Sequence, residues 1–168
     1  MAVSLISTVG SATANSYVNV ASANTYFEVR QDSDVWDDLS DASTGTVSAS
    51  TTKAALLIQA SREIDRTFRF FGGKEGTGRK GASDYQNLEF PRSNTIDTDG
   101  NVIIPDEIKE ATYEQAIWIR QRNATQVTEE GETIKQPKFS ELAYDLIKPW
   151  FNRQVAKQGK YTWEGSYF

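Results

Sequence analysis

Residues 88–116 constrain the fold most, because they place an irregular connection directly before an amphipathic helix. Phe90-Pro91-Arg92 predicts a short extended piece, since proline fixes its own φ and disfavours helical geometry at the preceding residue. Asp99-Gly100, between Ile96 and the apolar residues 102–104, predicts a tight turn, since glycine accepts positive φ without steric cost. Pro105 stands where a helix tolerates proline, in its first turn. We therefore expect an irregular chain up to Pro105 and a helix after it.

The helix expected after Pro105 has one apolar face with a period of 3.6 residues. Gln115 is a polar interruption of that face, and Ile117 lies on the opposite side of the helix. Ile117 therefore predicts a second apolar contact. The face itself consists of Ile108, Ala111, Thr112, Ala116 and Ile119.

A second helix is predicted over residues 50–71, where apolar positions are spaced by three and four residues in alternation. We expect it to pack in a bundle and to end at Gly72, a typical C-terminal cap. Its inward positions are Ala54, Leu57, Ser61, Ile64, Phe68 and Phe71.

Shorter elements complete the predicted fold. Residues 17–20 are expected to form a strand, Ser22 to cap a helix reaching Arg30, and Ser140 to cap a last helix that faces Leu142 inward and is cut by Pro149. The fold class is mainly α: a small helical bundle with short β-hairpin or extended segments and long loops. One domain would span residues 1–151, with loops at 43–52 and 72–89 and a hairpin at 124–136, followed by an interaction tail at 152–168.

The composition excludes much chemistry. The 168 residues include no cysteine and no histidine, which removes disulfides, thiolate metal sites and the commonest general base. Residues 97–101 resemble a calcium loop, but their glycine is fourth and not sixth, which favours a plain turn. The glycine-rich, basic residues 72–82 lack phosphate-loop spacing and are expected to be a solvated loop. We predict no catalytic, cofactor or metal residue, and hence not an enzyme.

Membrane association is not expected either. No apolar run approaches the roughly 18 residues of a spanning helix. The N-terminal residues lack the basic segment of a signal peptide.

Two oppositely charged segments suggest a subunit interface. Residues 28–41 carry six acids against one base, whereas residues 62–80 carry six bases against three acids. A head-to-tail interface joins two different faces, so these patches could meet between neighbouring subunits; the alternative is that both are solvated. The candidate interface residues are Asp32, Asp34, Asp37, Asp38, Arg62, Arg66 and Arg69.

The C-terminal tail is unusually aromatic, and aromatic residues are enriched in interface cores. We expect it to become ordered against a partner, with folding back onto the core as the alternative. The candidate contact residues are Trp150, Tyr161, Trp163, Tyr167 and Phe168.

Several short motifs occur in a recognisable order: residues 15–18 (NSYV), 23–27 (ANTYF) and 56–60 (LLIQA), then Phe90-Pro91-Arg92, Asp99-Gly100 and Ile104-Pro105. In this order they resemble the tailed-phage head-tail adaptor (head completion) family, also labelled DnaT-like. The resemblance covers residues 14–122. The family usually has tryptophan before Pro-Arg, where this chain has Phe90.

The resemblance implies a structural virion protein at the neck of the particle, made in the host cytoplasm. It would form a ring, commonly twelve-fold, between the portal protein and the tail or its terminator or stopper protein. DNA would pass through its channel without sequence-specific binding. Five residues are expected to shape a rigid connection and to act as a structural signature: Phe90, Pro91, Arg92, Gly100 and Pro105.

The alternative is a single-stranded-DNA-binding module, which needs a basic groove with interleaved aromatic residues. The basic candidates are the arginines of residues 62–69, and the aromatic candidates are Phe68 and Phe70. Phe68 belongs to the expected core, and the net charge of −5 suits a conduit that repels DNA better than a binder.

Overall fold

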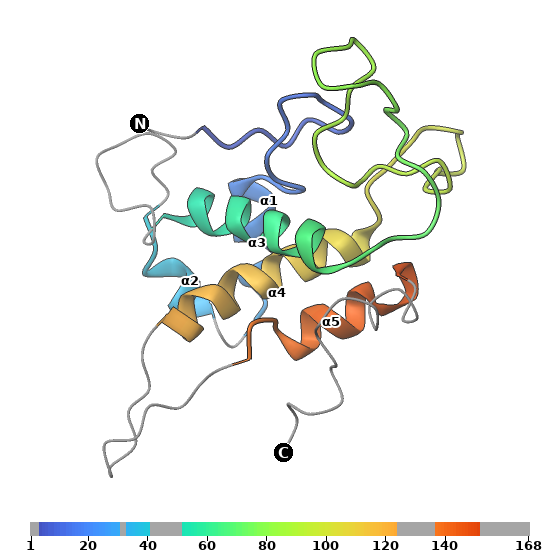
Figure 1. The fold of residues 1–168 in the computed structure, drawn as a ribbon. Coiled ribbons are helices and arrows are strands. Elements are labelled where there is room, and N and C mark those ends of the chain that lie inside the picture. The colour runs from blue at the N-terminus through green and yellow to red at the C-terminus, as the bar shows by residue number, and fades with distance from the viewer. Residues whose placement is uncertain (1–3, 31–32, 41–51, 124–136, 152–168) are drawn as a thin grey trace.

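The computed structural model describes residues 4–30, 33–40, 52–123 and 137–151 (Figure 1). The helices are α1 (Val20–Phe27), α2 (Ser33–Asp37), α3 (Lys53–Thr67), α4 (Asp106–Asn123) and α5 (Glu141–Ile147), followed by the 3-10 turn η1 (Lys148–Trp150). Within these ranges β-structure is limited to isolated bridges. The mainly α prediction is confirmed.

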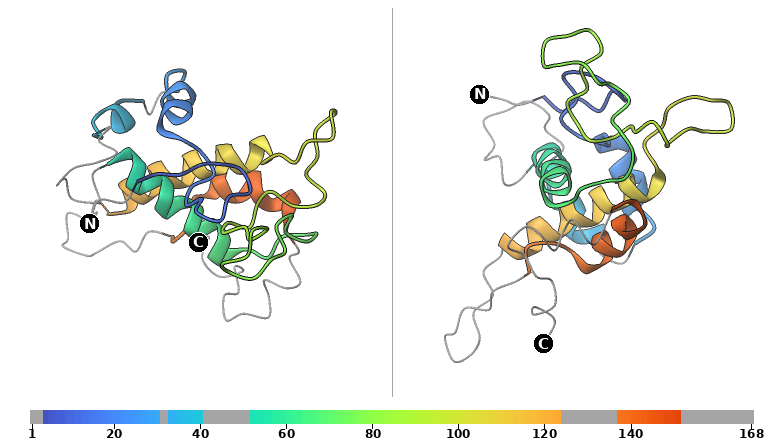
Figure 2. Two further views of the ribbon diagram at one scale, coloured as in Figure 1. Left: turned by 90° about the horizontal axis from the view of Figure 1, so that it is seen from above. Right: turned by 45° about the vertical axis from the view of Figure 1, so that its right-hand side comes forward.

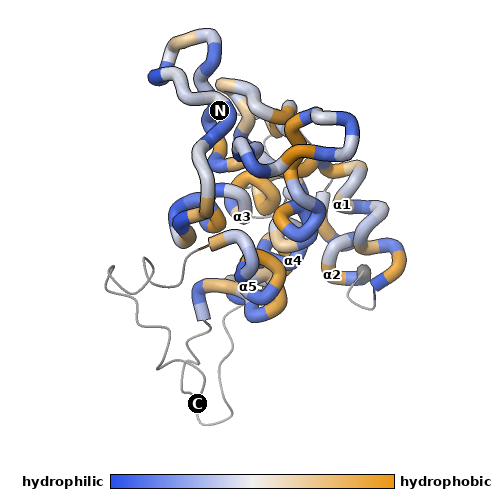
Figure 3. The backbone as a smooth tube through the Cα atoms, turned by 90° about the vertical axis from the view of Figure 1, so that its right-hand side faces the viewer, coloured by the Kyte–Doolittle hydropathy of each residue, from blue (hydrophilic) through white to orange (hydrophobic). Residues whose placement is uncertain are grey.

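Helix α4 lies at the centre, between α3 and α5 (Figure 1). The predicted apolar face of α4 is confirmed, since Ile108, Ala111 and Ile119 have no exposed surface. Ile117 on its other side is 4% exposed, which confirms the second apolar contact. Apolar residues gather where α4 meets its neighbours (Figure 3).

Gln115 is fully buried and hydrogen-bonded through both ends of its amide. Its Nε2 donates to Glu63 Oε2 of α3 at 2.7 Å and to the carbonyl of Lys138 at 3.3 Å. Its Oε1 accepts the N–H of Ser140 at 2.9 Å. Because a buried amide is stable only when satisfied, this polar interruption connects α4 to α3 and to the start of α5.

The irregular segments lie on the α3 side of the molecule. Residues 4–19 and 72–103 cover α3 on the side away from α5, as two views show (Figures 1 and 2). Their loops connect to the bundle through Tyr17, whose N–H donates to Ser61 Oγ of α3 at 3.1 Å.

The start of α1 differs from the prediction. Asn19 caps the helix by accepting the N–H of Ser22 at 2.8 Å, so Ser22 lies inside the helix and does not cap it. Residues 17–20 form no strand, because Val20 already belongs to α1. Two capping residues three positions apart compete here, and the earlier one gives the longer helix.

The end of α3 also differs, and this bears on the site. The helix stops at Thr67, because Phe68 is extended (φ −113°, ψ 153°). Phe70 then pairs with Phe151 in an antiparallel bridge, and the N–H of Phe71 donates to the carbonyl of Trp150 at 3.0 Å. Tertiary pairing thus replaces the last helical turn, and Gly72 (φ +74°) follows as a turn residue, not as the cap.

Helix α5 has the predicted cap, Ser140, whose side chain accepts the N–H of Ala143. Leu142 was expected to face inward but is 44% exposed, while Ala143 and Ile147 fill the core. The predicted hairpin at 124–136, the tail at 152–168 and nearly all of the loop at 43–52 lie outside the described residues. No helix in the described ranges has the length and apolar character needed to cross a membrane.

Candidate functional site

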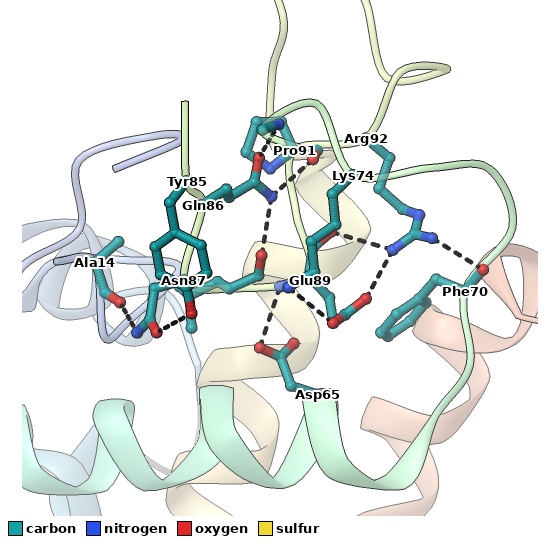
Figure 4. Close-up of polar contacts among 12 residues, drawn as sticks. Ala14, Asp65, Phe70, Lys74, Tyr85, Gln86, Asn87, Glu89, Pro91 and Arg92 are labelled. Atoms are coloured by element: carbon teal, nitrogen blue, oxygen red, sulfur yellow. Dashed lines mark hydrogen bonds and ion pairs between the residues drawn. The ribbon is translucent and has the colours of Figure 1, made fainter. Parts of the chain in front are cut away.

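Arg92 organises the connection after α3 (Figure 4). Its side chain is 7% exposed. The guanidinium donates to three consecutive carbonyls: Phe70 at 3.2 Å, Phe71 at 2.6 Å, and Gly72. It also donates to the carbonyl of Glu89 at 3.2 Å and to its carboxylate at 2.9 Å. A single buried cation therefore fixes the path of the chain where α3 has ended.

The residues before Arg92 are buried beneath it. The Phe90-Pro91 peptide is cis, and Phe90 is 1% exposed with its ring 4.7 Å from that of Phe70. Gln86, also buried, donates from Nε2 to the carbonyls of Leu88 and Pro91 at 2.9 Å each. This arrangement packs the segment against the end of α3.

Two acidic residues, Asp65 and Glu89, connect the same segment to α3 (Figure 4). Asp65 accepts the Tyr17 hydroxyl and, at 3.2 Å, the N–H of Glu89. Burial raises the pKa of the Asp65 carboxyl to about 7, against the lowering effect of these two hydrogen bonds. Burial and the nearby Asp65 also raise the pKa of Tyr17. The Glu89 carboxylate pairs with Lys74 at 3.0 Å in addition to Arg92.

Three arginines are exposed along α3 and just beyond its end. Arg62 and Arg66 are one helical turn apart, facing away from the buried Leu57 and Ile64, and Arg69 follows in the extended segment. All three are exposed, and none forms an ion pair or hydrogen bond within the described ranges. We call Arg62, Arg66 and Arg69 the basic face.

Phe71 is the aromatic side chain that reaches solvent beside the basic face. It is 48% exposed, whereas Phe68 is 2% exposed and lies in the core. Phe70 is partly buried against Phe90. The helix periodicity had placed Phe71 inward; this is wrong, because the chain leaves helical geometry at Phe68. The local sequence holds no signal for that exit, which depends on contacts with residues distant in sequence.

The predicted acidic side of the interface lies elsewhere. Asp34, Asp37 and Asp38 are exposed on and just after α2, while Asp32 lies outside the described residues. The end of this segment pairs with the start of α3, where Lys53 donates its N–H to the carbonyl of Ser40 at 3.0 Å. The acids are thus near the first residue of α3, and Arg66 and Arg69 near its last. A contact between these patches in two subunits stays a prediction.

The remaining predicted residues occupy separate places. Gly100 (φ +85°) lies in a turn in which Asp97 accepts two backbone N–H groups, bonds that lower the pKa of Asp97. Pro105 is buried, and its carbonyl accepts the N–H groups of Ile108 and Lys109 in the first turn of α4. Trp150 is partly buried with its ring 6.1 Å from that of Phe90. The four tail aromatics lie outside the described residues: Tyr161, Trp163, Tyr167 and Phe168.

The described part of the chain contains no group of three or more acidic side chains placed to hold a metal ion. The polar clusters around Arg92 and Gln115 are internal. The exposed guanidinium groups of the basic face can contact anions, and the exposed ring of Phe71 follows Arg69 in the sequence.

Comparison with known proteins identifies one family. A family model described as "Putative DnaT-like ssDNA binding protein" matches residues 1–144. No curated protein and no solved structure matches the chain.

This match corrects the identification made from the ordered motifs. The identification as a head-tail adaptor is wrong. The predictions that followed from it are therefore wrong too: the ring at the neck, the portal and tail partners, and the passage of DNA through a channel. The match favours the alternative, a DnaT-like module. Most of the motif residues, such as Phe90 and Arg92, are buried, so their order reports the fold and not what the surface contacts. The chain belongs to the DnaT-like family.

Proposed function

We propose that this protein binds single-stranded DNA through the basic face. The observation that carries the proposal is the family match, which spans residues 1–144 and includes the whole of α3 and α4. The exposed guanidinium groups of the basic face supply a matching chemistry. Arginine donates paired N–H groups that suit phosphate oxygens, and it stays charged at any physiological pH.

The two acidic residues of α3 are already engaged inside the molecule. Glu63 pairs with Arg122 at 3.1 Å and accepts from Gln115. Asp65 accepts hydrogen bonds from Tyr17 and Glu89. Because these carboxylates are directed into the protein, they do not neutralise the guanidinium groups on the solvent side.

The net charge of −5 limits the expected affinity and does not exclude binding. Local potential governs contact with a strand, while the acids of α2 lie near the other end of α3. Three phosphate contacts on a single strand give a slope of about −2 in a plot of log affinity against log salt. Binding is therefore expected to be micromolar at low salt and to weaken as salt rises.

The test is fluorescence anisotropy with a labelled oligothymidylate over about 50 mM to about 200 mM salt. The triple variant Arg62→Gln, Arg66→Gln, Arg69→Gln should lose about tenfold in affinity at low salt, and its slope should approach zero. The matched control removes the same charge from α4, from η1 and from the connection between α4 and α5: Arg120→Gln, Lys138→Gln, Lys148→Gln. Absence of salt-dependent binding by the unmodified protein, or an equal loss in both triple variants, contradicts the proposal.

A further inference from the structure

Phe71 is unusual among the phenylalanines of the described ranges. Five of the others are 4% exposed or less: Phe27, Phe68, Phe90, Phe139 and Phe151. Phe70 is partly buried against the rings of Phe68 and Phe90. Phe71 alone in this part of the chain exposes about half of its surface, at 48%.

The backbone of Phe71 is held on both sides. Its N–H donates to the carbonyl of Trp150 at 3.0 Å, and its carbonyl accepts from Arg92 Nε at 2.6 Å. Arg92 also holds the carbonyls before and after it, those of Phe70 and Gly72. An exposed ring on a fixed backbone loses little further freedom when a ligand packs on it, so this ring is preorganised for contact.

The surroundings of Phe71 indicate which ligand suits the ring. Arg69 of the basic face precedes it by two residues and has no ion-pair partner among the described residues. Two other cations nearby, Lys74 and Arg92, both pair with Glu89. A ring beside free cations matches a nucleotide, whose phosphate and base are recognised by charge and by stacking respectively.

We infer that Phe71 is a stacking platform for an unpaired base, and that it makes the site prefer a single strand to a duplex. This inference rests on the proposed function. A paired base is stacked inside its helix and shows the protein only phosphates and groove edges. A single strand can turn a base onto the ring while its phosphate contacts Arg69, which adds the stacking energy to the electrostatic one.

The experiment compares Phe71→Leu with the unmodified protein on single-stranded and duplex DNA of one length. Leucine keeps an apolar side chain and removes the π-face. Single-strand affinity should fall about tenfold, with duplex affinity and the salt slope unchanged, because no phosphate contact is lost. Phe71→Trp should retain single-strand affinity, and its added indole fluorescence should be quenched by the strand. Thr77→Ala, on the loop after Phe71, serves as the control and should bind normally.

Three outcomes overturn the inference. Phe71→Leu could leave the single-strand affinity unchanged, or it could lower the duplex affinity by the same factor. Without DNA, Phe71→Leu could also differ in mass from the unmodified protein, as measured by sedimentation. The last would show that a second copy covers the ring. Failure here is separable from failure of the proposed function. If stacking is wrong, the basic-face variant still loses salt-dependent binding; if the function is wrong, the unmodified protein does not bind.

Discussion

At the scale of single residues, Arg92 shows how one buried side chain can determine a surface. The sequence predicts that Phe90-Pro91-Arg92 is extended and irregular, because proline restricts the local backbone. It does not predict that Arg92 is buried, because its acceptors are the carbonyls of residues 70–72, some twenty positions earlier. Burial of this cation is possible because these carbonyls and Glu89 satisfy it.

Replacing Arg92 should therefore destabilise the protein strongly. Arg92→Met leaves several carbonyls without a donor, and we expect a loss of about 3 to 5 kcal/mol in the free energy of unfolding. Arg92→Lys should recover part of that loss, since one ammonium group cannot reach all the acceptors of the planar fork. Urea unfolding followed by circular dichroism measures both.

The control for this experiment is Arg79→Met, at an exposed arginine in the loop between α3 and Arg92. It should change the free energy of unfolding by about 0.5 kcal/mol or less. A similar value for Arg92→Met would mean that the buried hydrogen bonds contribute nothing net.

At the scale of elements, periodicity predicts the interior of a helix better than its ends. The apolar face of α4 follows from the spacing of Ile108, Ala111 and Ile119, because apolar residues at helical spacing lie on one side of the helix and that side packs into the core. The end of α3 does not follow, because the pairing of Phe70 with Phe151 outweighs the local preference to continue. The exposure of Phe71, the aromatic residue of the candidate site, could not be predicted either, because it depends on the same early end of α3.

Gln115 gives a prediction at this scale, because its amide joins three elements. Gln115→Leu keeps the side-chain volume but leaves the N–H of Ser140 and an oxygen of Glu63 without their partner. We expect a loss of about 2 kcal/mol in the free energy of unfolding, measured by thermal and urea denaturation. Ile117→Val, a smaller change on the same helix, should lose about 1 kcal/mol. If Gln115→Leu is as stable as the unmodified protein or more stable, the buried hydrogen bonds of Gln115 make no net contribution to the free energy of unfolding.

At the scale of the whole molecule, the fold class was predictable and the assembly was not. Alternating spacing and caps predict helices, and helices with one apolar face predict a bundle. The predicted ring-shaped assembly was wrong: it was inferred from the order of motif residues such as Phe90 and Arg92, which are buried and so report the fold. What a surface binds depends on exposed residues, and those of the candidate site carry only a weak sequence signal.

Stability against pH is a property of the whole molecule that Asp65 should dominate near neutrality. The groups facing its carboxyl are Tyr17, Glu89 and Lys74. Its pKa is raised from 3.8 to about 7 in the folded protein. The folded state therefore holds a proton that the unfolded chain releases, and this contribution is lost as pH rises from about 4 to about 7.

The expected loss from this one group is on the order of 4 kcal/mol over that range. Asp65→Asn cannot ionise, so its free energy of unfolding should not show this fall. Urea denaturation at several pH values, with the exposed Asp38→Asn as control, measures the difference. If the curve for Asp65→Asn runs parallel to that of the unmodified protein, the Asp65 carboxyl is already ionised at low pH.

The bridge between Phe70 and Phe151 has a consequence for the order in which the molecule is built. It closes a loop of about 80 residues, and contacts so distant in sequence form late because chain entropy opposes them until other structure has brought the ends together. During synthesis, α3 and α4 can be complete before residue 151 has left the ribosome. The ring of Phe71 would take its final position only then, so the chain would become able to hold a base at the last step of its own folding.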